Sequence, residues 1–305
     1  MFVVDLGFAC NNACVFCAQG ALRARPAEAP RDEDEDMAHR FAALRAGSTV
    51  ALVGGEPTLD ERLPDWIRAA EARGAAQIVV QTNGRRLAYR GYAAALRAAS
   101  KRLRLEVSVH GSTAPMHDYH TATPGSFGQT VKGLKHAQLE GIEFSATTVV
   151  TRSNFRHLVE ITRLVGTLGA RALQFSPAVP LGNAARVADR VIAAPELVSP
   201  HLARAMREAV AMGLQWRVGA RDSGPDVAGW FAGLGQAEEE TADGEPRRAK
   251  AEVERSEGRV SLPMLGRPAP ARAEVRTRER RTGTELRGIL PGLFNDEQPR
   301  EKGAG

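Results

Sequence analysis

The chain has 305 residues, and 43% of them are hydrophobic, which is enough to bury the core of one large α/β domain or two small ones. Its formal net charge of +5 is small for this length and does not by itself indicate binding to nucleic acid. No apolar run approaches the roughly 18 residues that a membrane helix needs, and the N-terminus lacks the basic segment of a secretory signal. We therefore expect a cytoplasmic protein that does not contact a membrane.

Short apolar segments alternate with amphipathic segments along residues 1–220. We expect strands over 2–8, 49–53, 77–81, 103–109, 143–150, 172–175 and 214–218. We expect helices over 37–46, 61–73, 89–99, 126–141, 155–168 and 195–212. Five of these helices end at a glycine just before an apolar run, which is typical of helix C-caps. The alternation predicts an α/β fold with a parallel sheet and right-handed crossovers, either open or curved into a barrel.

All three cysteines lie in one short segment, Cys10-Asn-Asn-Ala-Cys14-Val-Phe-Cys17, directly after the first expected strand. An odd number of cysteines cannot form a closed set of disulfides, and a structural zinc site closes with four ligands. Three soft thiolates suit an iron–sulfur cluster in which one iron has no protein ligand. A zinc site completed by a distant histidine and three buried thiols are the two other interpretations of this segment.

A second motif, Gly54-Gly55-Glu56-Pro57, follows the next expected strand. Glycines let the backbone approach a ligand closely, although an ordinary turn between strand and helix has similar residues. The cysteine spacing, with an aromatic residue before the last cysteine, and this Gly-Gly-Glu motif resemble the radical S-adenosylmethionine (radical SAM) superfamily. The resemblance is to the core domain of molybdopterin-precursor cyclase-like and peptide-modifying members.

The resemblance implies a partial (β/α)6 TIM-type barrel whose chemistry lies on the loops after the strands. We expect this domain over residues 1–220 and a C-terminal extension, largely disordered, over 221–305. From about Gln236 onward, large apolar residues are rare, and Arg and Glu interleave between Arg247 and Arg281. Such a composition is typical of disordered segments.

The resemblance also implies the cofactors and the residues that bind them. It implies that a [4Fe–4S] cluster is bound by Cys10, Cys14 and Cys17, and that S-adenosyl-L-methionine binds the remaining iron. It implies that the S-adenosylmethionine site includes Phe16, Gly54, Gly55, Glu56 and Ser108. In the family the Gly-Gly-Glu motif binds the methionyl amino group, the aromatic residue packs beside the adenine, and the hydroxyl contacts the ribose or carboxylate.

Three further residues are candidates for the substrate side of the site. Thr82 lies in Gln81-Thr-Asn-Gly84, which resembles a segment at the mouth of the site in the cyclase, although Asn-Gly is also a common turn. His110 shares a strand face with Ser108 and is either a catalytic residue or a buried structural histidine. Arg152 follows the next strand and suits a substrate carboxylate or phosphate. Asp118, in a segment expected to be a loop, either orients a histidine or fastens that loop.

The resemblance implies an enzyme that reductively cleaves S-adenosylmethionine and forms a 5′-deoxyadenosyl radical. That radical takes a hydrogen atom from an unidentified small-molecule or peptide substrate. A flavodoxin-type or ferredoxin-type electron donor is an expected partner, and nucleic acid is not. The alternative is a non-catalytic metal- or cluster-binding protein whose Arg-rich tail binds RNA or a protein.

Overall fold

The computed structural model describes residues 1–20 and 40–219. Seven strands form one parallel sheet in the order β1-β2-β3-β4-β5-β6-β7. The strands are β1 (Phe2–Asp5), β2 (Thr49–Val53), β3 (Gln77–Thr82), β4 (Leu103–Ser108), β5 (Glu143–Val150), β6 (Ala172–Pro177) and β7 (Gln215–Val218). Each strand pairs with the next strand in the chain, so the sheet order never reverses. This is the topology of a partial barrel, and the expected α/β fold is confirmed.

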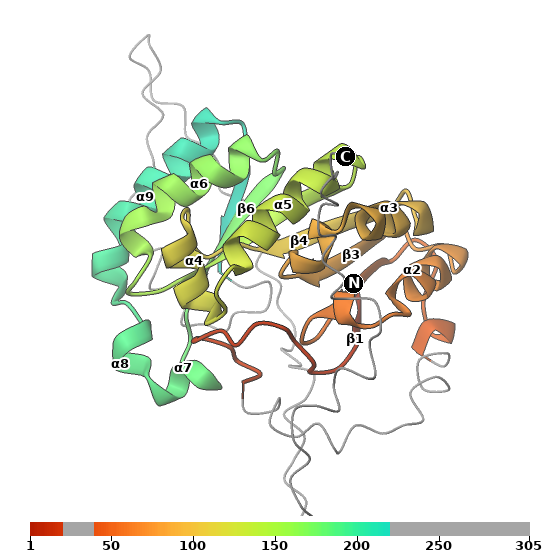
Figure 1. Cartoon of the computed structure of the whole chain (residues 1–305), viewed down its shortest axis with the longest axis horizontal. Helices are drawn as coiled ribbons and strands as arrows, with labels where there is room; N and C mark the ends of the chain where they lie inside the picture. The colour runs from red at the N-terminus through yellow and green to blue at the C-terminus, as the bar shows by residue number, and fades with distance from the viewer. Residues whose placement is uncertain (21–39, 220–305) are drawn as a thin grey trace, which may run out of the picture. The chain divides into compact units, whose positions relative to one another are not determined.

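The helices cover the outer face of the curved sheet (Figure 1). The α-helices are α2 (Leu63–Ala72), α3 (Arg90–Ala99), α4 (Ala114–Thr121), α5 (Ser126–Leu139), α6 (Leu158–Thr167), α7 (Asn183–Arg186), α8 (Ala188–Val191) and α9 (Pro195–Ala211). The described residues also contain three short 3-10 helices, η2 (Pro57–Leu59), η3 (Arg85–Ala88) and η4 (Phe155–His157). Among the described residues, no helix is long and apolar enough to span a membrane.

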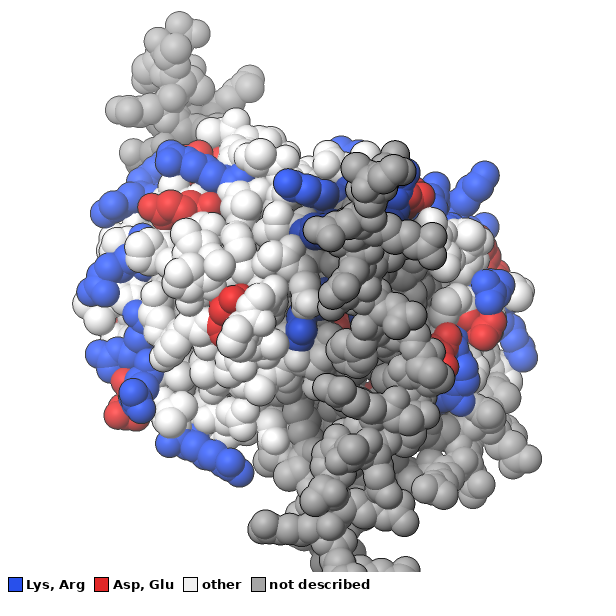
Figure 2. Space-filling view, viewed as in Figure 1, with Lys and Arg blue, Asp and Glu red and all other residues white. Residues whose placement is uncertain are grey.

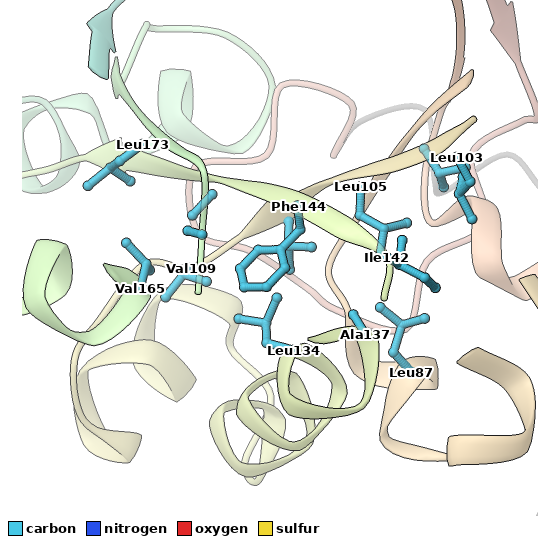
Figure 3. Packing of buried hydrophobic residues seen from close by; sticks show 14 of the residues in the cluster. Leu87, Leu103, Leu105, Val109, Leu134, Ala137, Ile142, Phe144, Val165 and Leu173 are labelled. Carbon is cyan, nitrogen blue, oxygen red and sulfur yellow. The ribbon is translucent and has the colours of Figure 1, made fainter. Parts of the chain in front are cut away.

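The main core lies between the sheet and the helices. Phe144 of β5 lies beside Leu105 of β4 and faces Leu134 of α5 (Figure 3). All three side chains are buried, and burying one such side chain contributes about 2 kcal/mol. Because side chains alternate along a strand, the residues between these buried ones lie on the opposite, inner face of the sheet.

The inner face of the sheet is polar. Glu106 of β4 accepts hydrogen bonds from Gln81 of β3 and Arg217 of β7, at 2.9 and 3.3 Å. Arg217 also donates to the side chain of Gln174 in β6, at 2.6 Å. These strands line a cavity of about 270 Å³. The residues that line it belong to the amino-terminal halves of β3 to β7. Closed barrels fill this space with branched aliphatic side chains, whereas polar and charged side chains contribute to the lining here.

Most expected elements lie within a few residues of the observed ones. The glycines expected at helix ends have φ between 67° and 88°, namely Gly47, Gly74, Gly141, Gly169 and Gly213. The helix expected over 37–46 falls partly outside the described residues, but residues 40–42 are helical, and Phe41 and Leu44 are buried. The C-terminal extension expected over 221–305 also lies outside the described residues.

Two local expectations are wrong. The segment around Asp118, expected to be a loop, is the helix α4. The spacing of Ser126 and Gln129, three residues apart at the start of a helix, also predicts a capping box, but Gly125 is the N-cap of α5. Asp118 accepts hydrogen bonds from Gly125 N and Phe127 N instead, at 2.7 and 2.8 Å. A carboxylate from the preceding helix therefore caps α5, and short-range spacing cannot reveal such a partner.

Candidate functional site

The cysteine loop, residues 10–17, follows β1 and is hydrogen-bonded along its backbone to the end of α4. Ala13 N donates to Thr121 O at 2.9 Å, and Val15 N donates to His120 O at 3.0 Å. These bonds hold alternate residues of the loop against the last turn of α4. Backbone amides paired in this way keep the loop in one conformation.

The loop after β2 forms a second attachment for the cysteine loop. Glu56 N donates to Ala9 O at 2.7 Å, and Gly55 N donates to the side chain of Gln19 at 3.1 Å. Gly55 has φ +46°, and a Cβ at this position would lie 2.2 Å from Ala9 O. Glycine is therefore required for close contact between the two loops, whatever ligand the motif binds.

The Glu56 carboxylate points into the protein and joins the loops after β2 and β3. Its Oε1 accepts hydrogen bonds from the hydroxyls of Thr58 and Thr82, both at 2.6 Å. Its Oε2 accepts a hydrogen bond from Asn83 N at 2.6 Å. Burial raises the pKa of the Glu56 carboxyl, and these hydrogen bonds oppose the rise. Glu56 and Thr82 thus have a structural role, since they bind each other in a buried network.

Asn83 and Arg85 connect the loop after β3 to the cysteine loop, and the sequence did not single out either residue for the site. Asn83 Nδ2 donates to the side chain of Asn11 at 2.6 Å. The Arg85 guanidinium donates to Asn11 O and to Asn12 Oδ1, the latter at 2.9 Å. Nothing in the local sequence distinguishes these polar side chains from solvated turn residues.

Asn183, at the start of α7, provides a fourth attachment. Its Nδ2 donates to Cys14 O and its backbone N to Cys17 O, both at 2.9 Å. The preceding Gly182 has φ +55°, and a Cβ there would lie 2.2 Å from Ala18 O. Loops after β2, β3, β4 and β6 therefore meet at the cysteine loop, as expected for the carboxyl ends of parallel strands.

Phe16 packs between the cysteine loop and a group of histidines. Its ring lies edge-to-face on His110, with ring centroids 4.7 Å apart, and 6.1 Å from the ring of His120. It also packs against a small apolar cluster formed by Ala178, Ala184 and Val191. The structure thus brings together two of the expected site residues, Phe16 and His110.

His110, His117 and His120 form a buried cluster of neutral imidazoles. His110 N donates to His117 Nδ1, and Val149 N donates to His110 Nδ1, both at 3.2 Å. Since each Nδ1 accepts, the proton of His110 and of His117 lies on Nε2. His120 Nδ1 lies 2.7 Å from Met116 O, a carbonyl that only accepts, so His120 carries its proton on Nδ1.

Burial is the main reason that these histidines are neutral. It lowers the pKa of His117 to about 4 and holds the pKa of His110 well below its usual value, with a further lowering from the neighbouring histidines. Burial also lowers the pKa of His120. At neutral pH, His110 can donate a hydrogen bond from Nε2, but it does not carry a positive charge.

The remaining expected residues lie on other parts of the rim. Arg152 is exposed and donates to the backbone carbonyl of Asp189 in α8 at 2.6 Å. Ser108 ends β4, where it pairs in register with Thr147 of β5. Asp118 caps α5 and fastens its own segment, which was one of the two roles considered for it.

The donor set fits an iron–sulfur cluster better than a zinc site. The three thiols are partly buried, and their loop is held by the four attachments described above. Among the described residues, no group of three or more His, Cys, Asp or Glu side chains converges as a metal site. His120 is not available to complete a zinc site, because it is bonded through both ring nitrogens.

Charged side chains are spread around this face of the molecule. Lys and Arg side chains lie mainly along its margin, and few charged side chains lie over α4 (Figure 2). The Arg-rich tail that the alternative function would require lies outside the described residues.

Comparisons with known proteins agree with the cysteine and Gly-Gly-Glu motifs. A protein-family model described as the Radical SAM superfamily matches residues 4–165. The AdoMet-dependent heme synthase of Oleidesulfovibrio alaskensis is 31% identical over 188 residues, which cover 61% of this chain and 47% of the relative. The mycofactocin maturase MftC of Mycobacterium ulcerans is 30% identical over 186 residues, which cover 60% and 48%. The chain thus spans about half the length of these curated relatives.

Solved structures share the fold at low sequence identity. Streptococcus suis SuiB bound to S-adenosylmethionine has a TM-score of 0.56 and 16% identity, covering 73% of this chain and 52% of that one. SuiB bound to its precursor peptide SuiA also has a TM-score of 0.56, with 15% identity and coverage of 72% and 48%.

Proposed function

Because the chain belongs to the radical SAM superfamily, we propose that it is an enzyme that binds a [4Fe–4S] cluster and S-adenosylmethionine. When both are bound and an electron is supplied, they provide a carbon-centred radical that takes a hydrogen atom from a substrate. The observation that carries this proposal is the cysteine loop, which presents three thiols where the loops after four strands meet.

In this proposal, Cys10, Cys14 and Cys17 bind three irons of the cluster. The backbone of Gly54 and Gly55 binds the methionyl amino group, and buried Glu56 holds that backbone in place. We assign Glu56 this supporting role because its carboxylate already accepts hydrogen bonds from the Thr58 and Thr82 hydroxyls and from Asn83 N.

Phe16, His110 and Ser108 form the adenosine side of the proposed site. Phe16 packs beside the adenine, and the neutral His110 is held against Phe16 with its remaining ring proton on Nε2. Ser108 contacts the ribose or carboxylate. Thr82 and Arg152 remain proposals for the substrate side, although both already bind protein groups in the structure.

The substrate is a small molecule or a peptide, and the electron donor is of the flavodoxin or ferredoxin type. Relatives named heme synthase and mycofactocin maturase support a broad substrate class rather than one compound.

Anaerobic reconstitution with iron and sulfide tests this function. We expect about four irons and four sulfides per chain, and formation of 5′-deoxyadenosine when dithionite and S-adenosylmethionine are added. Binding of one zinc, with no cleavage of S-adenosylmethionine, would refute the proposal.

The Cys14→Ala variant tests the ligand assignment. We expect it to lose both the cluster absorbance and the cleavage, because two thiolates cannot bind three irons. The matched control is Ser145→Ala, a hydroxyl on the inner face of β5, away from the loops that carry the cysteines. Full turnover by Cys14→Ala would show that Cys14 is not a ligand.

A further inference from the structure

The Cys10 sulfur faces two N–H donors from the protein. Asn12 N lies 3.4 Å from Cys10 Sγ, and Asn83 Nδ2 lies 3.9 Å from the same atom. Sulfur accepts hydrogen bonds over longer distances than oxygen does, so both contacts are hydrogen bonds. Asn83 comes from the loop after β3, far from Cys10 in the sequence.

The orientation of the Asn83 amide is determined by its neighbours. Its Oδ1 accepts a hydrogen bond from Arg85 N at 3.0 Å, and its Nδ2 donates to Asn11 Oδ1 at 2.6 Å. Asn83 is only 7% exposed, and Thr130 binds its backbone carbonyl at 2.9 Å. The amide therefore cannot rotate to turn its oxygen toward Cys10 without losing two hydrogen bonds.

Arg85 places a positive charge beside the same cysteine. Its guanidinium is bonded to Asn11 O, to Asn12 Oδ1 and, through Nε, to Gln129 of α5 at 2.6 Å. These hydrogen-bond partners are neutral and position the guanidinium, while the Glu56 and Asp118 carboxylates attract it more weakly than Cys10 does. Burial lowers the pKa of Arg85, and attraction to Cys10 is the largest effect that opposes this lowering.

Hydrogen bonds to cluster sulfurs and nearby positive charge favour the reduced, more negative state of an iron–sulfur cluster. We propose that Asn83 and Arg85 raise the reduction potential of the cluster by donating to, and placing positive charge beside, the Cys10 thiolate. This inference rests on the proposed function. Asn83 and Arg85 then act through Cys10, as positioning residues, and determine how easily the cluster accepts its electron.

The test measures the midpoint potential of the reconstituted protein in an anaerobic titration followed by electron paramagnetic resonance. Arg85→Gln removes the charge but keeps groups that can bond to the cysteine loop. We expect the ratio of reduced to oxidised cluster at a given potential to fall about tenfold, a shift of about 59 mV for one electron. Asn83→Asp, which replaces the N–H donor with an anionic oxygen, should shift the potential in the same direction.

Arg86→Gln is the matched control, because it removes the same charge from the next residue. The Arg86 guanidinium lies over Tyr92 and donates to Thr58 O at 2.5 Å, whereas the Arg85 guanidinium binds the cysteine loop. We expect the midpoint potential of the cluster in the Arg86→Gln variant to equal that in the wild type. Arg85→Lys, which restores the charge without the planar fork, should recover most of the shift.

The outcomes separate the inference from the proposed function. If the wild-type chain binds no cluster, the proposed function fails. If it does bind one, equal potentials for Arg85→Gln, Arg86→Gln and the wild type would overturn the inference alone. Loss of the cluster in every Arg85 and Asn83 variant would also overturn it, since the two residues would then only hold the loop.

Discussion

At Gly55 and Gly182, the loops after β2 and β6 lie so close to the segment that carries the cysteines that there is no room for a side chain. A Cβ at either position would lie 2.2 Å from a backbone carbonyl oxygen of residues 9–18. Both have positive φ, at 46° and 55°. At the scale of single residues, the Gly-Gly-Glu motif therefore has a structural function besides its expected contact with a cofactor.

Gly55→Ala should weaken this contact. The left-handed conformation costs a residue with a Cβ about 1 kcal/mol or more, and the clash with Ala9 O adds to that cost. We expect a lower thermal midpoint and less iron bound after reconstitution.

Gly128→Ala is the control for that prediction. Gly128 lies in α5. Apart from its chain neighbours and the backbone of its own helix, no atom lies within 4 Å of a Cβ added at this position. We expect this variant to be more stable by about 0.5–1 kcal/mol, because alanine favours the helix. Equal iron content and equal midpoints in the two variants would show that the close approach at Gly55 is not needed.

At the scale of elements, α4 is the largest difference between expectation and structure. Its sequence, Ala-Pro-Met-His-Asp-Tyr-His-Thr, is rich in polar residues and has no clear apolar stripe. The helix buries His117 and His120, and its last turn binds the cysteine loop. It is stabilised by tertiary contacts that an apolar pattern of helical period does not encode.

The buried histidines predict a loss of stability in mild acid. The unfolded pKa of histidine is about 6.5, whereas that of His117 in the folded chain is about 4. The unfolded state therefore takes up protons first as the pH falls. Stability is complete above about pH 6.5 and decreases down to about pH 4, by about 3 kcal/mol from this residue.

Urea unfolding between pH 7.5 and pH 4.5 measures this effect, with wild type and His117→Asn both prepared without added iron. The Asn side chain retains an acceptor for His110 N but does not titrate. We expect a flatter dependence of the unfolding free energy on pH for the variant. Curves of equal slope would mean that His117 is not kept neutral by burial.

At the scale of the whole molecule, the seven strands of the sheet and the helices over them lie between residues 2 and 218 of the described part of the chain. We predict that a chain ending after Gly235 still binds the cluster and cleaves S-adenosylmethionine, because the cysteine loop and its four attachments lie within the described residues. Iron content and 5′-deoxyadenosine yield, compared with the full-length chain, measure this. Loss of cluster binding on truncation would show that the extension is part of the fold.

The polar inner face is also a property of the whole molecule. The alternation along β4 indicates that Arg104 and Glu106 lie opposite the buried leucines. The partners of these charges come from other strands, since Arg104 pairs with Glu143 at 2.8 Å and Glu106 with Arg217 at 3.3 Å. Both pairs remain partly exposed, so each contributes little stability, and their main effect is to keep the interior hydrophilic.

The sequence by itself determined the parallel α/β architecture, the positions of most helices and strands, and the pattern of thiols and glycines that resembles the family. Each of these is encoded in residues close together in the chain, through periodicity, capping glycines and motif spacing. It did not reveal the helix α4, the cap that Asp118 provides for α5, or the tautomers of the three histidines.

Only the tertiary structure decided how the loops after the strands interact. The contacts of Asn83, Arg85 and Asn183 with the cysteine loop join residues that are 70 or more positions apart in the sequence. A polar side chain in a turn looks the same in sequence whether it faces water or another loop. Its partner is defined only when the parallel sheet brings the carboxyl ends of its strands to one edge.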